Sequence, residues 1–106
     1  MGFIMDTRCA EFHGEMEGFG RSGLFSSGIR HIHINDYKGG YKDWDAMYPI
    51  PQPRKGQIDW DGFFKYIKDS SYDGSFTLEA PSMQEQGVDA KTLNESMRFI
   101  RRSLAR

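Results

Sequence analysis

Three short apolar runs in this chain each end at a residue of a type that can bind a metal ion. The residues that end the runs are Asp6, His33 and Glu79. Strands that run parallel in one sheet bring their carboxyl ends to the same edge. The pattern therefore predicts a parallel sheet in which these three side chains converge on one cation.

Segments with strand and helix patterns alternate along the chain. The expected strands and helices lie at about residues 2–6, 29–35 and 75–80 and at about 12–26, 60–70 and 88–104, respectively. The pattern is clearest at 60–70, where Asp59 is a good N-cap, and weakest at 12–26, where each glycine costs about 1 kcal/mol in a helix. The alternation favours a single α/β domain over residues 1–106, built from parallel βα units.

A long loop is expected between residues 36 and 56, because glycines and prolines there exclude a regular helix or strand. Long loops in compact domains are uncommon and often functional. This one follows the strand that carries His33. We expect it to cover an active site, with a mobile surface segment as the alternative.

Composition excludes several classes of protein. The 14 Lys and Arg residues are balanced by 15 Asp and Glu residues, so nothing favours binding to a nucleic acid or an anionic membrane. The single cysteine, Cys9, excludes an internal disulfide and suits a reducing compartment. The chain begins without a basic leader and holds no apolar run of the roughly 18 to 20 residues that span a bilayer. We therefore expect a cytoplasmic protein with no membrane and no nucleic-acid partner.

Four motifs, taken in order, resemble those of a known family. They are Phe3-Ile4-Met5-Asp6-Thr7, His31-Ile32-His33-Ile34-Asn35-Asp36, Gly56-Gln57-Ile58-Asp59-Trp60 and Tyr72-Asp73-Gly74-Ser75-Phe76-Thr77-Leu78-Glu79. Over about residues 2–104 the chain resembles the C-terminal part of a xylose isomerase-like TIM barrel, in the sugar phosphate isomerase/epimerase superfamily. The resemblance implies a partial TIM barrel, in which three parallel βα units match strands six to eight of a (β/α)8 barrel.

A full barrel needs about 250 residues, whereas this chain has 106. A sheet of three units would leave two open edges, and bare parallel edges aggregate. Either the missing N-terminal barrel half belongs to a longer protein, or the edges pair with other copies in a homo-oligomer. We favour association into at least a dimer.

The resemblance also implies a metal site and a reaction. In the family a divalent cation (Mn, Mg, Co or Zn) is held by two Glu, one Asp and one His, and Asp6, His33 and Glu79 occupy matching positions. The fourth ligand, a Glu on an earlier strand, is absent from this chain. Such a cation polarises a sugar carbonyl, and Glu79 would move the neighbouring proton as a catalytic acid/base. The implied activity is that of a sugar or sugar phosphate isomerase or epimerase.

The chain departs from the family pattern at two places. Where the family commonly has Asp-Thr-x-His, Cys9 stands in place of the His that often contacts substrate. Cys9 is thus a candidate substrate contact, with an inert small side chain as the alternative. Asp43-Trp44-Asp45 stands where the endonuclease IV branch has Asp-x-His, which argues against a three-zinc DNA repair site. Trp44 is a candidate for stacking on a sugar ring, or for covering exposed core.

The candidate ligands have structural alternatives. Asp6 could instead cap the segment that follows its strand, and His33 could be a buried histidine bonded to backbone. We expect His31 to be structural and both histidines to face away from the isoleucines of their strand. Asp36 either forms the turn after Asn35 or orients a ligand.

Two functions therefore stay open. One is a metal-dependent isomerase or epimerase that acts on a small-molecule sugar. The other is a non-catalytic barrel fragment that self-associates without turnover. The loop cations Lys38, Lys42, Arg54 and Lys55 are expected to be solvated rather than bound to a phosphate.

Overall fold

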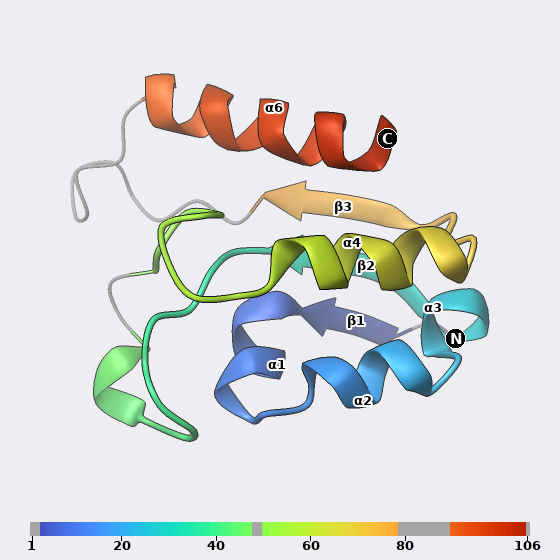
Figure 1. Cartoon of the computed structure of the whole chain (residues 1–106), viewed down its shortest axis with the longest axis horizontal. Helices are drawn as coiled ribbons and strands as arrows, with labels where there is room; N and C mark the ends of the chain where they lie inside the picture. Colours follow the sequence, from blue (N-terminus) through green and yellow to red (C-terminus); the bar gives the residue numbers. More distant parts are fainter. Residues whose placement is uncertain (1–2, 48–49, 79–89, 106) are drawn as a thin grey trace.

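The computed structural model describes residues 3–47, 50–78 and 90–105. Its strands β1 (Phe3–Asp6), β2 (Ile29–Ile34) and β3 (Ser75–Leu78) form one sheet in the order β1-β2-β3. Both strand pairs are parallel, and the arrows in Figure 1 point the same way. The predicted parallel sheet is confirmed, with the carboxyl ends of its strands at a common edge. Residues 2, 79 and 80 of the predicted strands lie outside the described residues.

The two faces of the sheet differ in character. Met5, Ile32 and Ile34 are almost fully buried on the face where the helices pack. The other face carries the paired positions Ile4, Asp6, His31, His33, Ser75 and Thr77. Ile4 is 68% exposed, so no element in the described part of the chain covers its end of this face. The predicted separation of the isoleucines of β2 from its histidines is confirmed.

Three short helices follow β1, where the sequence predicted one helix. They are α1 (Thr7–Phe12), α2 (Met16–Arg21) and α3 (Leu24–Ser27). The predicted single helix at 12–26 is therefore wrong. Its path is interrupted at Gly14 and Gly23, whose φ angles of 67° and 79° lie in the left-handed region that ends helices. Helical structure also begins earlier than predicted, because Asp6 caps α1 directly after the strand.

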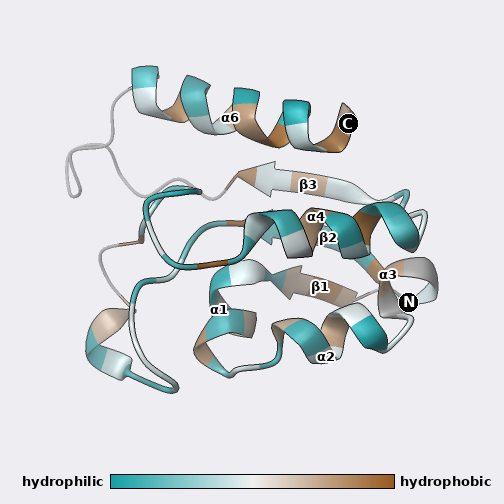
Figure 2. Cartoon of the chain, in the orientation of Figure 1, coloured by the Kyte–Doolittle hydropathy of each residue, from teal (hydrophilic) through white to brown (hydrophobic). Residues whose placement is uncertain are grey.

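The two longer helices agree with their predictions. Before α4 (Trp60–Asp69), the Asp59 side chain accepts a hydrogen bond of 3.1 Å from the Gly62 N–H, as expected of an N-cap. The buried face of α4 consists of Trp60, Phe63, Phe64 and Ile67. The second helix, α6 (Ala90–Ala105), covers the part of the predicted helix 88–104 that the structure describes. Hydrophilic and hydrophobic stretches alternate along both helices in Figure 2, as in amphipathic helices packed on a core.

The helices form a layer along the sheet. α4 contacts α2 on one side and α6 on the other, and α1 and α3 contact β2. In Figure 1, α4 lies over the sheet, α6 lies beyond its β3 edge, and α2 lies on the side of β1. A parallel sheet with one outer layer of helices is the arrangement of part of a TIM barrel. No helix in the described ranges is both long enough and apolar enough to cross a bilayer.

The segment between β2 and α4 is the long loop that the sequence predicted. Within its described part the regular structure is η1 (Trp44–Ala46), a short 3-10 helix that Asp43 caps. The loop leaves β2 at the carboxyl edge of the sheet (Figure 1). It therefore begins at the edge where the candidate ligands were predicted.

Candidate metal and substrate site

Asp6 and His33 are direct neighbours in the sheet. Their Cα positions are register partners across β1 and β2, and Thr77 of β3 is the partner of His33 on the other side. Register partners point to the same face, so a carboxylate, an imidazole and a hydroxyl form a row towards the carboxyl edge. Two of the three predicted metal ligands are thus brought together. The third, Glu79, lies outside the described residues.

Within the described ranges, the Asp6 side chain has one hydrogen-bond partner. Its Oδ1 accepts a hydrogen bond of 2.9 Å from the Cys9 N–H and so caps α1. This cap is the alternative that the sequence suggested for Asp6. An ionised carboxylate has about four acceptor positions on its two oxygens, so capping and metal binding are compatible.

The two histidines of β2 differ in their surroundings. His31 lies against two hydroxyls of β3, since its Nδ1 hydrogen-bonds to Ser75 Oγ and its Nε2 lies 2.9 Å from Thr77 Oγ1. Both of its ring nitrogens are used, which agrees with the predicted structural role. His33 makes no side-chain hydrogen bond to other described residues, and its ring contacts His31 edge to face with the centroids 4.9 Å apart. Among the described residues, His33 is thus the histidine of β2 whose ring nitrogens have no hydrogen-bond partner.

A buried polar pair holds the carboxyl ends of β1 and β2 together. The Thr7 hydroxyl donates to the Asn35 carbonyl oxygen at 2.5 Å and accepts from the Asn35 N–H at 2.9 Å. The Asn35 Oδ1 accepts from the Arg8 N–H at 2.8 Å. Thr7 and Asn35 are fully buried, so these bonds are strong and fix the strand ends that carry Asp6 and His33. The sequence did not indicate this pair, although Thr7 directly follows β1 and Asn35 directly follows β2.

Asp36 anchors the long loop. Its carboxylate accepts four hydrogen bonds of 2.8 to 3.0 Å. The donors are the backbone N–H groups of Tyr37, Arg54 and Ile58 and the indole N–H of Trp60. Asp36 is fully buried, and these bonds satisfy its acceptors while they join both ends of the loop to the start of α4. The structure thus supports the first of its two predicted roles, that of shaping the chain after β2.

Tyr37 ties the first half of the loop together. The side chain is fully buried, and its hydroxyl donates to the Gly40 carbonyl oxygen at 2.8 Å. Burial raises the pKa of Tyr37 above its ordinary value of 10.0, and the nearby charge of Asp43 raises it further. The phenol therefore keeps its proton, and its hydrogen bond, at neutral pH.

The two predicted substrate contacts lie on different elements. Cys9 is half-buried in the first turn of α1, next to the cap that Asp6 provides. Trp44 in η1 is 72% exposed, and its ring contacts that of Phe12 edge to face with the centroids 4.7 Å apart. The loop thus packs on α1, where Arg8 Nη1 also donates to the Met47 carbonyl oxygen at 2.6 Å. Roles for Cys9 and Trp44 in substrate binding stay predictions.

The donors at the sheet edge suit a divalent cation but do not complete its coordination. Asp6 offers a carboxylate oxygen and His33 an imidazole nitrogen, both of which are ligands for Mn, Co and Zn. Within the described ranges, no group of three or more His, Cys, Asp or Glu residues is placed to hold a metal ion. A full coordination shell therefore needs further ligands, of which Glu79 is the predicted one.

Comparison with known protein families agrees with the fold. The family model described as xylose isomerase-like TIM barrel matches residues 1–103. The chain therefore belongs to the xylose isomerase-like TIM barrel family. No curated protein and no solved structure matches the chain. The family and the partial-barrel fold that the motifs suggested are confirmed.

Proposed function

We propose that the chain is the metal-binding part of a sugar isomerase or epimerase. The observation that carries the proposal is the side-by-side placement of Asp6 and His33 towards the carboxyl edge of a parallel sheet. TIM-barrel enzymes have their active sites at this edge. Membership of the xylose isomerase-like family favours the same class of reaction. Because one fold can host many chemistries, the proposal depends on this ligand pair rather than on the fold alone.

The proposed reaction moves a proton at the carbon next to a sugar carbonyl. Asp6, His33 and Glu79 would hold a divalent cation (Mn, Mg, Co or Zn), which when bound polarises the carbonyl and makes the neighbouring C–H more acidic. Glu79 would take up and return the proton, while Cys9 and Trp44 would contact the sugar. An epimerase needs a second acid/base on the opposite face of the carbon. In this proposal that group is a Glu supplied by another chain or segment.

Solvent exchange tests the enzyme proposal. The protein is incubated with MnCl₂ and D-fructose in D₂O, and proton NMR follows deuterium incorporation next to the carbonyl. We expect incorporation by the wild type, loss in Glu79→Gln, and no change in the control Glu15→Gln, whose side chain is exposed and makes no cap hydrogen bond. Absence of exchange by the manganese-loaded wild type would contradict catalysis by this chain.

Exposed apolar side chains on β1 favour a second candidate, a non-catalytic fragment that self-associates. Phe3 and Ile4 are 61% and 68% exposed, and β1 and β3 each have one neighbour among the described strands. Open strands with apolar side chains tend to pair with other chains. Light scattering after size-exclusion chromatography should give at least a dimer for the wild type and a monomer for Ile4→Lys. The control Leu104→Lys places the same charge on α6. A monomeric wild type would contradict this candidate.

A further inference from the structure

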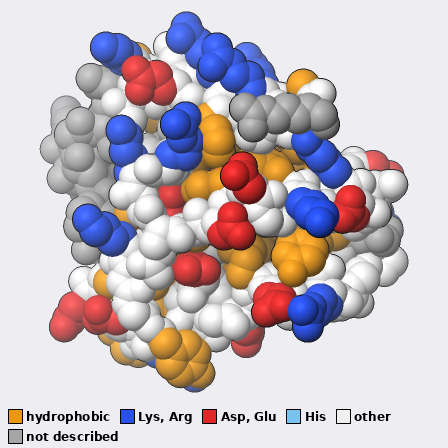
Figure 3. Space-filling model, in the orientation of Figure 1, with side chains coloured by type: hydrophobic (Ala, Val, Ile, Leu, Met, Phe, Trp, Pro, Cys, Tyr) orange, Lys and Arg blue, Asp and Glu red, His pale blue; other side chains and the backbone are white. Residues whose placement is uncertain are grey.

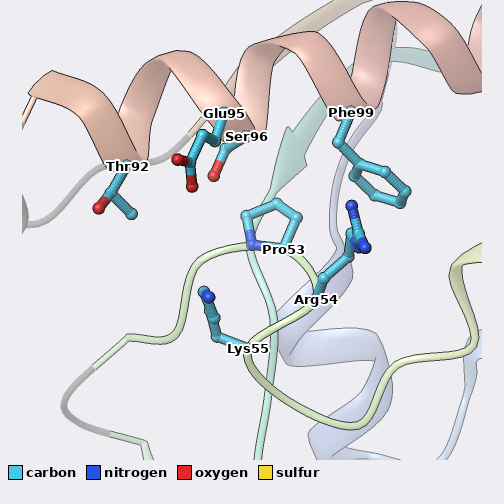
Figure 4. Close-up of a pocket in the computed structure, with 7 residues that line it drawn as sticks. All are labelled: Pro53, Arg54, Lys55, Thr92, Glu95, Ser96 and Phe99. Carbon is cyan, nitrogen blue, oxygen red and sulfur yellow. The ribbon is translucent and has the colours of Figure 1, made fainter.

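A cavity of about 230 Å³ separates the long loop from α6. Its lining residues come from these two segments: Pro53, Arg54 and Lys55 from the loop, and Thr92, Glu95, Ser96 and Phe99 from α6. In Figure 4 the side chains of the two segments face each other across the space between them. Pockets for drug-sized ligands have volumes of about 300 to 1,000 Å³, so this one suits a smaller ligand. None of its lining residues belongs to the predicted metal site.

Arg54 is held in a fixed and uncommon conformation. Its φ angle of 75° lies in the left-handed region, which residues other than glycine rarely adopt. The buried Asp36 carboxylate accepts a hydrogen bond of 2.9 Å from the Arg54 N–H. The guanidinium lies over the Phe99 ring, 5.1 Å from its centroid. Backbone strain of this kind is concentrated at functional sites, and here it positions the arginine at the cavity before a ligand arrives.

The cavity carries excess positive charge. Arg54 and Lys55 bring two cations to its lining, whereas Glu95 brings one carboxylate. Neither cation forms an ion pair with a carboxylate in the described part of the chain. Thr92 and Ser96 add hydroxyl groups on the side of α6. A planar guanidinium, an ammonium group and hydroxyls are together the donors with which proteins bind phosphate.

We propose that this cavity binds a phosphate group, either as inorganic phosphate or as the monoester of a small metabolite. The Arg54 guanidinium and the Lys55 ammonium pair with phosphate oxygens, and hydroxyls of α6 donate from the other side. The Glu95 carboxylate repels a dianion and therefore lowers the affinity. The sequence suggested that these loop cations are solvated. We depart from that expectation for Arg54 and Lys55, because the loop brings them together opposite α6.

Calorimetric titration of the metal-free protein with inorganic phosphate tests the proposal. We expect saturable binding that weakens about tenfold in Arg54→Gln and severalfold in Lys55→Gln, because each variant removes one charge-assisted contact. The matched control is Arg101→Gln. Arg101 is exposed, lies in α6 and does not line the cavity. Figure 3 shows basic side chains at the top of the molecule, where α6 lies in Figure 1. Arg101→Gln should change the affinity for phosphate by less than about twofold, since distant surface charges are screened by salt.

A second pair of variants, which remove a negative charge instead of a positive one, tests whether Glu95 faces the bound group. Glu95→Gln should bind phosphate about threefold more tightly, because it removes a repelling carboxylate. Glu15→Gln makes the same charge change at an exposed position outside the cavity and should have no effect. Circular dichroism of each variant checks that it is folded. If Arg54→Gln is not folded, Lys55→Gln and Glu95→Gln decide the outcome.

Two further ligands distinguish the source of the phosphate. Tighter binding of fructose 6-phosphate than of inorganic phosphate, with no binding of fructose, would assign the cavity to a monoester. Binding of inorganic phosphate alone would assign it to the free ion. The proposal is wrong if the wild type shows no saturable binding, or if Arg101→Gln weakens it as much as Arg54→Gln. Because no metal is present in these titrations, their failure would not bear on the proposed isomerase function.

Discussion

At the scale of single residues, the buried polar groups next to β2 determine where the loop runs. Asp36 accepts four hydrogen bonds, three from loop or helix-start backbone and one from the Trp60 indole. Hydrogen bonds to a charged group contribute about 1.5 to 3 kcal/mol each, and a buried donor left without a partner costs about 1 to 3 kcal/mol. One carboxylate therefore holds a segment that has little regular structure of its own.

Asp36→Asn tests this role with a side chain of nearly the same size and shape. An amide replaces one acceptor oxygen by a donor, so two of the four bonds are lost and buried N–H groups face each other. We expect the free energy of unfolding in urea to fall by about 3 kcal/mol or more. The exposed Asp73→Asn should change it by less than about 0.5 kcal/mol. Equal unfolding midpoints for wild type and Asp36→Asn would contradict the anchoring role.

Two tyrosines give the protein a dependence on alkaline pH. Burial raises the pKa of both Tyr37 and Tyr72 above 10.0, with further increases from Asp43 and Asp73, respectively. Above about pH 10 the unfolded chain loses these protons more readily than the folded chain, so the folded state holds more protons and loses stability as pH rises. Urea unfolding should give a constant stability from pH 7 to 9 and a decline above about pH 10. The decline should be smaller in Tyr37→Phe, and an equal decline in both proteins would refute the assignment.

At the scale of elements, close approach of α2 and α4 depends on a glycine. A Cβ atom on Gly20 would lie 2.5 Å from the Cγ atom of the Tyr66 ring, whereas one on Gly18 would meet no atom within 4 Å. Both glycines are inside α2, and neither has a positive φ. Gly20 is thus required for packing, while Gly18 merely weakens the helix.

The pair Gly20→Ala and Gly18→Ala separates these two effects. Gly20→Ala should lower the free energy of unfolding by about 1 to 3 kcal/mol, because Cγ is fixed close to the backbone and the ring cannot move aside cheaply. Gly18→Ala should raise it by up to about 1 kcal/mol through better helix propensity. Thermal unfolding of both variants is the measurement. Shifts of the same sign would contradict the close contact between Gly20 and the Tyr66 ring.

Local sequence signals were enough to predict some helices but not others. α4 was predictable because an N-cap at Asp59 and an apolar stripe at helical spacing agree with each other. The segment after β1 was not, because its breaks depend on the left-handed φ angles of Gly14 and Gly23, which composition does not reveal. The glycines lowered the expected stability of a helix there but did not indicate where it would divide.

At the scale of the whole molecule, topology made the site predictable in outline. The rule that parallel strands share a carboxyl edge was enough to place Asp6 beside His33. The contacts that distinguish His33 from His31 were not predictable, because they depend on the register that sets Ser75 and Thr77 against β2. The cavity between Arg54 and α6 was likewise missed, since it forms only when the loop folds back onto the helix.

Manganese binding by three proteins tests whether Asp6 and His33 form a metal site. Isothermal titration compares the wild type with His33→Gln and His31→Gln, two neighbouring histidines on one face of β2. We expect His33→Gln to weaken Mn²⁺ binding by at least about tenfold and His31→Gln to change it by less than about threefold. Unchanged affinity in His33→Gln, or equal losses in both variants, would contradict a metal site built on Asp6 and His33.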